Sequence, residues 1–329
     1  MNLCLSGSPE AVAVCFESLN GSCLRSTSPL ALRLSLYFLF TSIIVLTVTG
    51  NLLVIVVITF SQNHFSAGTN NLILSLSVAG LVLGGFVMPF SMVRSIESCW
   101  YFGHVFCCLH TTVDIILCNA TVWHLMFISV DRYVAIFYPL HYHNRMTNKT
   151  FVAMIGSSWG LASVFGFATI ISDPQVVIRG GSNKACVGGC LSLHAREIGM
   201  EYALFFYFIP VSVMMIIYGR ISFIAQRHTK AIHSNTNHAN PSAPSTAKDF
   251  KATKTFTIVV GNFLLCWTPF FMCNIIDPLV GHTICALLYE GLMWVAYLNA
   301  TFNPLIYVFF YKWFRETAKV LLSKLFIQV

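Results

Sequence analysis

Seven apolar segments limit what this chain can fold into. Each is at least as long as the roughly 20 residues that a helix needs to cross a lipid bilayer. The segments run over residues 34–60, 71–93, 104–136, 151–173, 198–226, 250–277 and 283–310. Only 9% of the residues are charged, whereas about 25% are charged in a typical soluble domain. The sequence therefore predicts an all-α membrane protein, a bundle of seven transmembrane helices.

The distribution of basic residues predicts how the bundle is oriented. An odd number of crossings puts the two ends of the chain on opposite sides of the membrane. Residues 131–150, 220–254 and 312–329 hold thirteen of the nineteen Lys and Arg residues but only three of the twelve acids. Because cytoplasmic segments carry an excess of Lys and Arg, we expect these regions inside the cell and the N-terminus outside. The net charge of +7 then reflects topology in the plasma membrane and not nucleic-acid binding.

This topology divides the chain into three regions. Residues 1–33 form an extracellular N-terminus, which includes Asn20 in an Asn-Gly-Ser sequence that can accept a glycan. Residues 34–310 form the seven-helix domain. In residues 311–329, apolar residues recur at helical spacing with Lys and Arg between them, which predicts a short amphipathic cytoplasmic helix lying on membrane lipid. The polar connection at residues 226–247 is predicted to be disordered.

The third apolar segment carries charged residues near both of its ends. Asp114 and Asp131 are seventeen residues apart, which is about 25 Å along a helix and close to the roughly 30 Å of a hydrocarbon core. Arg132 and Tyr133 follow Asp131 directly. Because a charge inside a membrane span costs free energy, each of these positions is a candidate functional site.

Short motifs occur at particular places in the other segments. They are Asn51 in Gly-Asn-Leu-Leu-Val, Trp159, Pro210, Cys266-Trp267-Thr268-Pro269 and Asn303-Pro304-Leu305-Ile306-Tyr307. Together with Asp131-Arg132-Tyr133, and in this order, they resemble the rhodopsin-like receptors over essentially the whole chain. The resemblance implies a G-protein-coupled receptor whose partner is a heterotrimeric G protein. No nucleophile–base pair or metal-ligand spacing stands out, so we expect neither an enzyme nor a cofactor.

Three runs resemble the trace amine-associated receptors more closely. They are Met88–Gly103, Asn20-Gly21-Ser22-Cys23 and Asn299–Phe314, the last with Ala300 where that family usually has Ser. The resemblance implies a receptor for volatile or biogenic amines that is mostly expressed in olfactory neurons. It also implies that a stimulatory G protein raises cyclic AMP. Two disulfides are implied by the same resemblance: Cys107 with Cys190, and Cys23 with Cys186.

The residues themselves also indicate an amine site. Asp114 is the only acid that we place well inside the outer half of the bundle, where it is either a helix-packing carboxylate or the counter-ion of an ammonium group. Aromatic faces beside a carboxylate suit alkylammonium ions through cation–π contacts, although any one of these rings could serve packing alone. The candidate ligand-binding residues are Asp114, Ile115, Cys118, Trp267, Phe270, Phe271, Trp294 and Tyr297.

The fifth segment narrows the class of ligand. Residues 202–210 contain no pair of serines that could bind a catechol. Some relatives carry a second acid in this segment, whereas here Ala203 and Phe206 are at the expected inward positions. A monoamine is therefore favoured over a diamine. A receptor for a peptide or for another biogenic amine remains the alternative.

The resemblance also implies a set of residues that switch the receptor on. Asp249 matches the family position that pairs with Arg132 in the resting state, and breaking that pair would let the sixth helix move outward. Pro269 and Pro304 each remove a backbone donor and permit a kink. The candidate switch residues are Asp131, Arg132, Tyr133, Asp249, Trp267, Asn303, Pro304 and Tyr307.

Gly80 departs from the family pattern. It stands in the second segment where the family carries an Asp that anchors an allosteric sodium ion. Since a glycine offers no carboxylate, we expect no sodium site and no other metal site.

Overall fold

The computed structural model confirms the predicted seven-helix bundle. It describes residues 13–25, 28–61, 67–171, 186–190, 203–234, 244–281, 284–310 and 312–327. Seven helical spans in these residues are long and apolar enough to cross a membrane. The main helices are α1 (Leu30–Ser61), α2 (Ala67–Val82), α3 (Met88–Glu97), α4 (His104–Phe137), α6 (Asn148–Ile171), α10 (Ile209–Ser234), α11 (Pro244–Leu279), α12 (Ala286–Phe310) and α13 (Lys312–Ile327). The short elements are η1 (Leu83–Val87), η2 (Pro139–His141), α5 (Tyr142–Arg145) and η3 (Leu204–Phe208).

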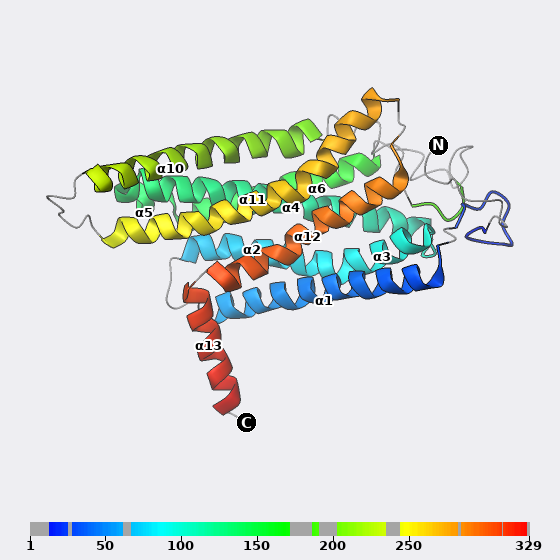
Figure 1. Ribbon diagram of the computed structural model, residues 1–329, viewed down its shortest axis with the longest axis horizontal. Helices are drawn as coiled ribbons and strands as arrows, with labels where there is room; N and C mark the ends of the chain where they lie inside the picture. Colours follow the sequence, from blue (N-terminus) through cyan, green and yellow to red (C-terminus); the bar gives the residue numbers. More distant parts are fainter. Residues whose placement is uncertain are drawn as a thin grey trace.

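The seven spans run side by side along the long axis of the molecule (Figure 1). The third span, α4, packs against α2, α6, α10 and α11, so its residues lie near the middle of the bundle. The N-terminal segment lies at one end of the bundle. At the other end, α13 leaves the bundle across the direction of the spans and packs beside α1 (Figure 1).

Two of the spans contain a π-helical turn. The second span passes from α2 through η1 into α3, and the fifth begins with η3 just before Pro210. In η1, Gly84 lies close to α1, because a Cβ atom at this position would be 2.9 Å from a methyl group of Thr47. A π-turn inserts one residue into the helical repeat and is frequent at functional sites. Here it sets which residues of α3 face α1 and which face α12, the two helices against which α3 packs.

The helices next to the longest connection extend further than the sequence predicts. α10 continues to Ser234 and α11 begins at Pro244, so the prediction that residues 226–247 are disordered is wrong at both ends. A helix that leaves the membrane can continue in water where residues such as Ala, Lys and Gln favour the conformation. Residues 235–243 lie outside the part of the chain that the structure describes.

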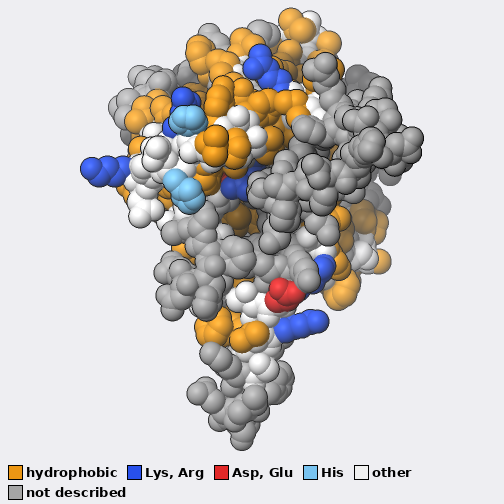
Figure 2. Space-filling model, turned by 90° about the vertical axis from the view of Figure 1, so that its left-hand side faces the viewer, with side chains coloured by type: hydrophobic (Ala, Val, Ile, Leu, Met, Phe, Trp, Pro, Cys, Tyr) orange, Lys and Arg blue, Asp and Glu red, His pale blue; other side chains and the backbone are white. Residues whose placement is uncertain are grey.

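The tail forms the expected amphipathic helix. Phe314 of α13 is 2% exposed and belongs to the apolar core, whereas Arg315 and Lys319 are exposed. This end of the bundle is rich in basic side chains (Figure 2). The exposed basic residues here are His141, His143, Arg145, Lys149, Arg220, Arg315 and Lys319.

Candidate amine site

Asp114 lies in the first third of α4, toward the N-terminal end of the bundle, and is 8% exposed. The hydroxyl group of Tyr297 on α12 donates a hydrogen bond of 2.7 Å to its Oδ2 atom. The thiol of Cys118, one helical turn along α4, donates to its Oδ1 atom over 3.4 Å. Both donors are neutral.

Three other acids that are buried or half-buried differ from Asp114 because each pairs with an arginine, whereas buried Asp277 accepts a hydrogen bond from the backbone N–H of Ile284. Glu97 pairs with Arg25 and Arg33. Asp131 pairs with Arg132, and Glu290 pairs with Arg94. Within the residues that the structure describes, no ion pair involves Asp114. A buried carboxylate with only neutral donors favours the arrival of a cation, since the attraction between opposite charges grows as water is excluded.

A chain of polar groups connects Asp114 to the second span. The Tyr297 hydroxyl is 3.4 Å from the Ser91 hydroxyl of α3. Ser91 is in turn 3.3 Å from Nε2 of His110, and this nitrogen is 3.0 Å from the carbonyl oxygen of Val87. His110 therefore joins α4 to η1 and α3, which agrees with a role in helix–helix contact.

The aromatic candidates form two groups. On α12, the ring of Trp294 stands edge-on to Tyr297 at 5.7 Å and stacks on Phe40 of α1 at 3.8 Å. On α11, Trp267 lies 6.2 Å from Phe270 and 5.7 Å from Phe271. The second group packs around Tyr207 of η3, whose ring stacks on Phe271 at 4.2 Å.

The structure thus connects Cys118, Tyr297 and Trp294 to Asp114 through direct or successive contacts. Trp267, Phe270 and Phe271 belong to the group on α11, and Ile115 is half-buried beside Asp114 on α4. Phe206, which was expected to face inward, packs against Phe165 of α6 at 3.9 Å. The two acids that precede residue 203, Glu197 and Glu201, lie outside the described residues.

Sequence reasoning missed a second polar network above this site. Arg94 and Glu290 form an ion pair across α3 and α12, with 3.2 Å between Nε and Oε1. Ser95 donates to Glu290 over 2.5 Å and accepts from the indole nitrogen of Trp294 over 3.0 Å. The available signal was Arg94 directly after the second apolar segment and Glu290 within the seventh.

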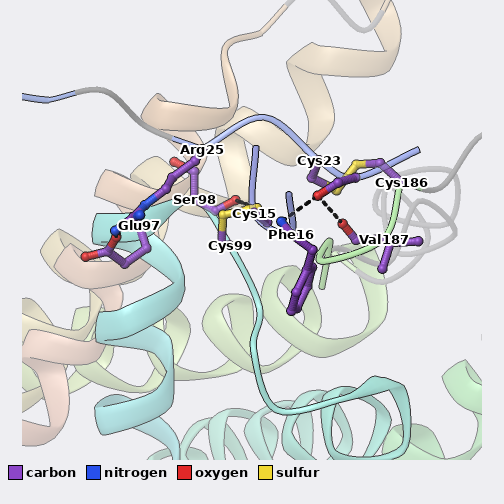
Figure 3. Close-up of a disulfide and its surroundings, with 10 residues drawn as sticks. Cys15, Phe16, Cys23, Arg25, Glu97, Ser98, Cys99, Cys186 and Val187 are labelled. Atoms are coloured by element: carbon purple, nitrogen blue, oxygen red, sulfur yellow. Dashed lines mark hydrogen bonds and ion pairs between the residues drawn. A yellow bond between two sulfur atoms is a disulfide. The ribbon is translucent and has the colours of Figure 1, made fainter. Parts of the chain in front are cut away.

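Three disulfides between described residues hold the loops at this end of the bundle. The structure joins Cys107 to Cys190 and Cys23 to Cys186, and it also joins Cys15 to Cys99, a bond that the sequence analysis did not anticipate. Figure 3 shows the N-terminal segment tied to the end of α3 on one side and to the Cys186 loop on the other. Backbone hydrogen bonds of 2.9 Å, from Cys23 to Val187 and from Val187 to Gly21, reinforce the second connection. The side chain of Asn20, the candidate glycan acceptor, is exposed beside them.

Glu97 gives the N-terminal segment a further, ionic attachment. Its side chain is 6% exposed, accepts from Arg25 over 2.6 Å and from Tyr37 over 3.0 Å, and forms an ion pair with Arg33 (Figure 3 shows Arg25 and Glu97). One carboxylate therefore connects the N-terminal segment, α1 and α3.

Replacing Glu97 with glutamine should lower the stability of the folded chain. Breaking a buried ion pair typically costs about 3–5 kcal/mol, but Arg25 and Arg33 are 39% and 25% exposed, so water should reduce the cost to about 1–3 kcal/mol. The melting temperature of the purified protein in detergent measures this. Glu17→Gln removes the same charge at an exposed position and should leave the melting temperature unchanged. Equal effects of the two substitutions would contradict the assignment.

Comparison with known proteins decides the family. Residues 50–307 match the family described as 7 transmembrane receptor (rhodopsin family). The chain is 41% identical over 319 residues to Trace amine-associated receptor 1 of Macaca mulatta, covering 94% of this chain and 93% of that protein. It is 39% identical over 324 residues to Trace amine-associated receptor 4 of Mus musculus, covering 96% and 92%. It is 36% identical over 313 residues to Trace amine-associated receptor 13c of Danio rerio, covering 94% and 92%.

The chain belongs to the trace amine-associated receptors. As a member of the rhodopsin family it is a multi-pass membrane receptor that couples to G proteins, and it is not an enzyme. The resemblance drawn from the three sequence runs is therefore confirmed, and so is the receptor class inferred from the order of the motifs.

At the other end of the receptor, Arg132 is held by its neighbours. Its Nε and Nη2 atoms donate to Asp131 over 2.9 and 2.5 Å, and Nη2 also donates to Thr69 of α2 over 2.7 Å. Tyr142 of α5 donates to the second oxygen of Asp131 over 2.8 Å. Burial first, and then the charge of Asp131, raise the pKa of Tyr142. The predicted partner Asp249 is in α11, but its side chain lies outside the described residues, so the latch between Arg132 and Asp249 stays a prediction.

The remaining switch candidates lie along α4, α11 and α12. Tyr133 stacks on Phe137 at 4.4 Å. Trp267, Asn303 and Tyr307 are each 3% exposed. Pro304 packs against Gly50 of α1, where a Cβ atom would lie 3.0 Å from the proline ring. This close approach explains why a glycine precedes Asn51.

The space beside Gly80 is filled by Asn51. A Cβ atom at residue 80 would lie 2.6 Å from Oδ1 of Asn51. The Asn51 amide donates to the carbonyl oxygens of Thr47 over 2.8 Å and of Ala300 over 3.1 Å. A carboxylate at residue 80 could therefore enter only if the Asn51 side chain rotated away and gave up these hydrogen bonds.

Sodium should have no specific effect on agonist affinity in the wild-type receptor. Because Gly80 supplies no carboxylate, exchanging sodium for a large organic cation at constant ionic strength should leave affinity unchanged. Gly80→Asp alone should destabilise the receptor by about 1–3 kcal/mol through overpacking. It should not create a sodium effect, because the Asn51 side chain occupies the space. Gly80→Asp combined with Asn51→Ala opens the space and should show sodium-dependent affinity. A saturable, sodium-specific loss of affinity in the wild type would refute this.

Proposed function

We propose that this receptor binds small protonated monoamines through Asp114. The observation that carries the proposal is that Asp114 is buried and receives only neutral donors, whereas Glu97, Asp131 and Glu290 each have an arginine. An ammonium group would form an ion pair with Asp114, as an arginine does with each of those acids.

Two further observations support a small amine. Tyr297 contacts the carboxylate, and Trp294 lies edge-on to Tyr297 one turn away. An aromatic ring face attracts an alkylammonium ion by about 0.5–2 kcal/mol. The relatives that match over nearly the whole chain are named for trace amines. Absence of a serine pair in residues 203–210, which the structure describes, disfavours a catechol.

We also propose that the N-terminal end faces outward and that the basic end meets a stimulatory G protein, raising cyclic AMP. The exposed basic residues around α5 and α13 (Figure 2) support this orientation, because cytoplasmic surfaces are the basic ones. Expression in olfactory neurons is the corresponding proposal for the tissue. It rests on the family resemblance alone.

The alternative ligands differ in how well they suit this end of the receptor. Another biogenic amine would use the same carboxylate. A peptide would need a wide opening, but the Cys15–Cys99 and Cys23–Cys186 bonds tie the N-terminal segment across this end. We therefore favour the amine.

A screen of small amines with a cyclic-AMP readout tests the proposal. Wild type and Asp114→Ala are compared in parallel, with surface expression measured for each. Glu17→Gln, which removes an exposed acid, is the control for net charge. We expect at least one monoamine to raise cyclic AMP in wild type and Glu17→Gln but not in Asp114→Ala. If every active compound works equally well on Asp114→Ala, the proposal is wrong.

A further inference from the structure

The ion pair of Arg94 and Glu290 lies within the ends of two helices that are long and apolar enough to span a membrane. The two side chains are 14% and 18% exposed, and they face each other from α3 and α12. Charged residues within spans are rare and usually functional, because taking them out of water costs free energy. Apolar residues at both positions would avoid this cost. The presence of the pair therefore suggests a function.

Contacts connect this pair to the amine site. Glu290 accepts from Ser95, and Ser95 accepts from Trp294. The ring of Trp294 contacts Tyr297, whose hydroxyl binds Asp114. Arg94 also lies within electrostatic range of Asp114. The ion pair therefore forms the next layer of the site toward the N-terminal end of the bundle.

The helix α12 sets the spacing of the two residues that connect to these acids. Glu290 precedes Tyr297 by seven residues, so their backbone positions are two helical turns, or about 10 Å, apart. Tyr297 in turn holds Asp114 through its hydroxyl group. Linear diamines of five to seven carbons have ammonium groups separated by a comparable length.

The charges of the three residues determine which cation the site can neutralise. Asp114 and Glu290 are negative and Arg94 is positive, so one negative charge is left over. A monoamine supplies one positive charge. The second ammonium of a diamine would instead meet a carboxylate that is already paired, next to a like charge, and specificity often comes from such repulsion.

We infer that Arg94 makes this receptor selective for monoamines by neutralising Glu290, and that Glu290 is a latent second ammonium site. The inference rests on the proposed function, because it requires that a first ammonium binds at Asp114. It assigns a specificity role to two residues that do not touch Asp114 directly.

The test compares matched amines on charge variants of the receptor. The probes are 1-pentylamine with 1,5-diaminopentane, and 1-heptylamine with 1,7-diaminoheptane, each measured by cyclic AMP at equal surface expression. In Arg94→Met we expect diamine potency relative to the matched monoamine to rise at least tenfold. Arg94→Gln, which keeps amide donors for Glu290 but carries no charge, provides the same test if Arg94→Met does not reach the surface.

Two controls isolate the charge. Arg94→Lys keeps a cation and should keep the wild-type potency ratio. Arg94→Met combined with Glu290→Gln removes both charges and should return the ratio to within threefold of wild type. An unchanged ratio in both single neutral variants overturns the inference. So does a gained diamine response that persists in the double variant, because the second carboxylate would then be elsewhere.

The experiments distinguish failure of the specificity role of Arg94 from failure of the amine site at Asp114. If monoamines activate wild type and lose activity in Asp114→Ala, but the neutral Arg94 variants leave the ratio unchanged, only the specificity role of Arg94 is overturned. If no monoamine depends on Asp114, the proposed function fails, and the inference that rests on it fails too.

Discussion

Replacing Asp114 with asparagine should weaken the binding of an active monoamine by a factor of about 10² to 10³. The substitution keeps the shape of the side chain and removes its charge, so a bound ammonium ion would be buried without a partner. Leaving one member of a buried ion pair uncompensated typically costs about 3–5 kcal/mol, and each 1.4 kcal/mol is about tenfold in affinity. Competition binding on purified receptor measures the effect directly.

Companion measurements separate charge from shape. Asp114→Glu should lose less affinity than Asp114→Asn, since it keeps the carboxylate. Tyr297→Phe removes the 2.7 Å hydrogen bond to Asp114 but not the charge of Asp114. It should weaken the binding free energy of the amine by about 1–3 kcal/mol. A neutral isostere of the amine should bind wild type and Asp114→Asn alike. If Asp114→Asn responds at nearly the wild-type concentration, the counter-ion is elsewhere, and Glu290 is the next residue to test.

Removing the bond between Cys107 and Cys190 should cause a large loss of stability. The two residues are 83 positions apart, and closing a loop of that length stabilises the folded state by about 4–5 kcal/mol in the chain-entropy model. The double variant Cys107→Ser/Cys190→Ser should therefore melt well below wild type and reach the cell surface poorly.

The adjacent cysteine provides the control for this prediction. Cys108 shares the same turn of α4, with its sulfur 3.7 Å from Nε2 of His104, and Cys108→Ser should melt within a few degrees of wild type. Cys15→Ser/Cys99→Ser opens a loop of nearly equal length, with a separation of 84, and should cost a similar amount if chain entropy dominates. Equal melting temperatures for wild type and Cys107→Ser/Cys190→Ser would contradict the prediction.

The sequence by itself determined the number and order of the membrane spans and the helical tail that follows them. A membrane span is recognised by the length and apolarity of one continuous segment, so it needs no knowledge of distant contacts. The same locality made Asp114 and Arg132 conspicuous, because each interrupts an apolar run. Receptor class also followed from local motifs such as Asn303-Pro304 and Trp267, each in its own span.

The residues at which helices begin and end were harder to predict from the sequence. Hydropathy falls where a helix leaves the membrane, but the helix itself can continue in water as long as its residues favour the conformation. This explains why α10 and α11 extend to Ser234 and back to Pro244, into a connection whose composition predicted disorder. An apolar composition indicates which residues lie in the membrane. The backbone hydrogen bonds of a helix can continue past the last apolar residue.

Only the tertiary structure decided which charges and cysteines meet. Glu97 binds Arg25 and Arg33, whereas Arg94, three residues before it, binds Glu290 on α12. One helical turn separates these two choices, and the π-turn of η1 fixes which residues of α3 face α1 and which face α12. Pairing depends on side-chain direction between segments that are far apart in the sequence, and residue order alone does not contain that direction. For the same reason, only the folded chain shows that the Asn51 side chain fills the space beside Gly80 and that Cys15 bonds to Cys99.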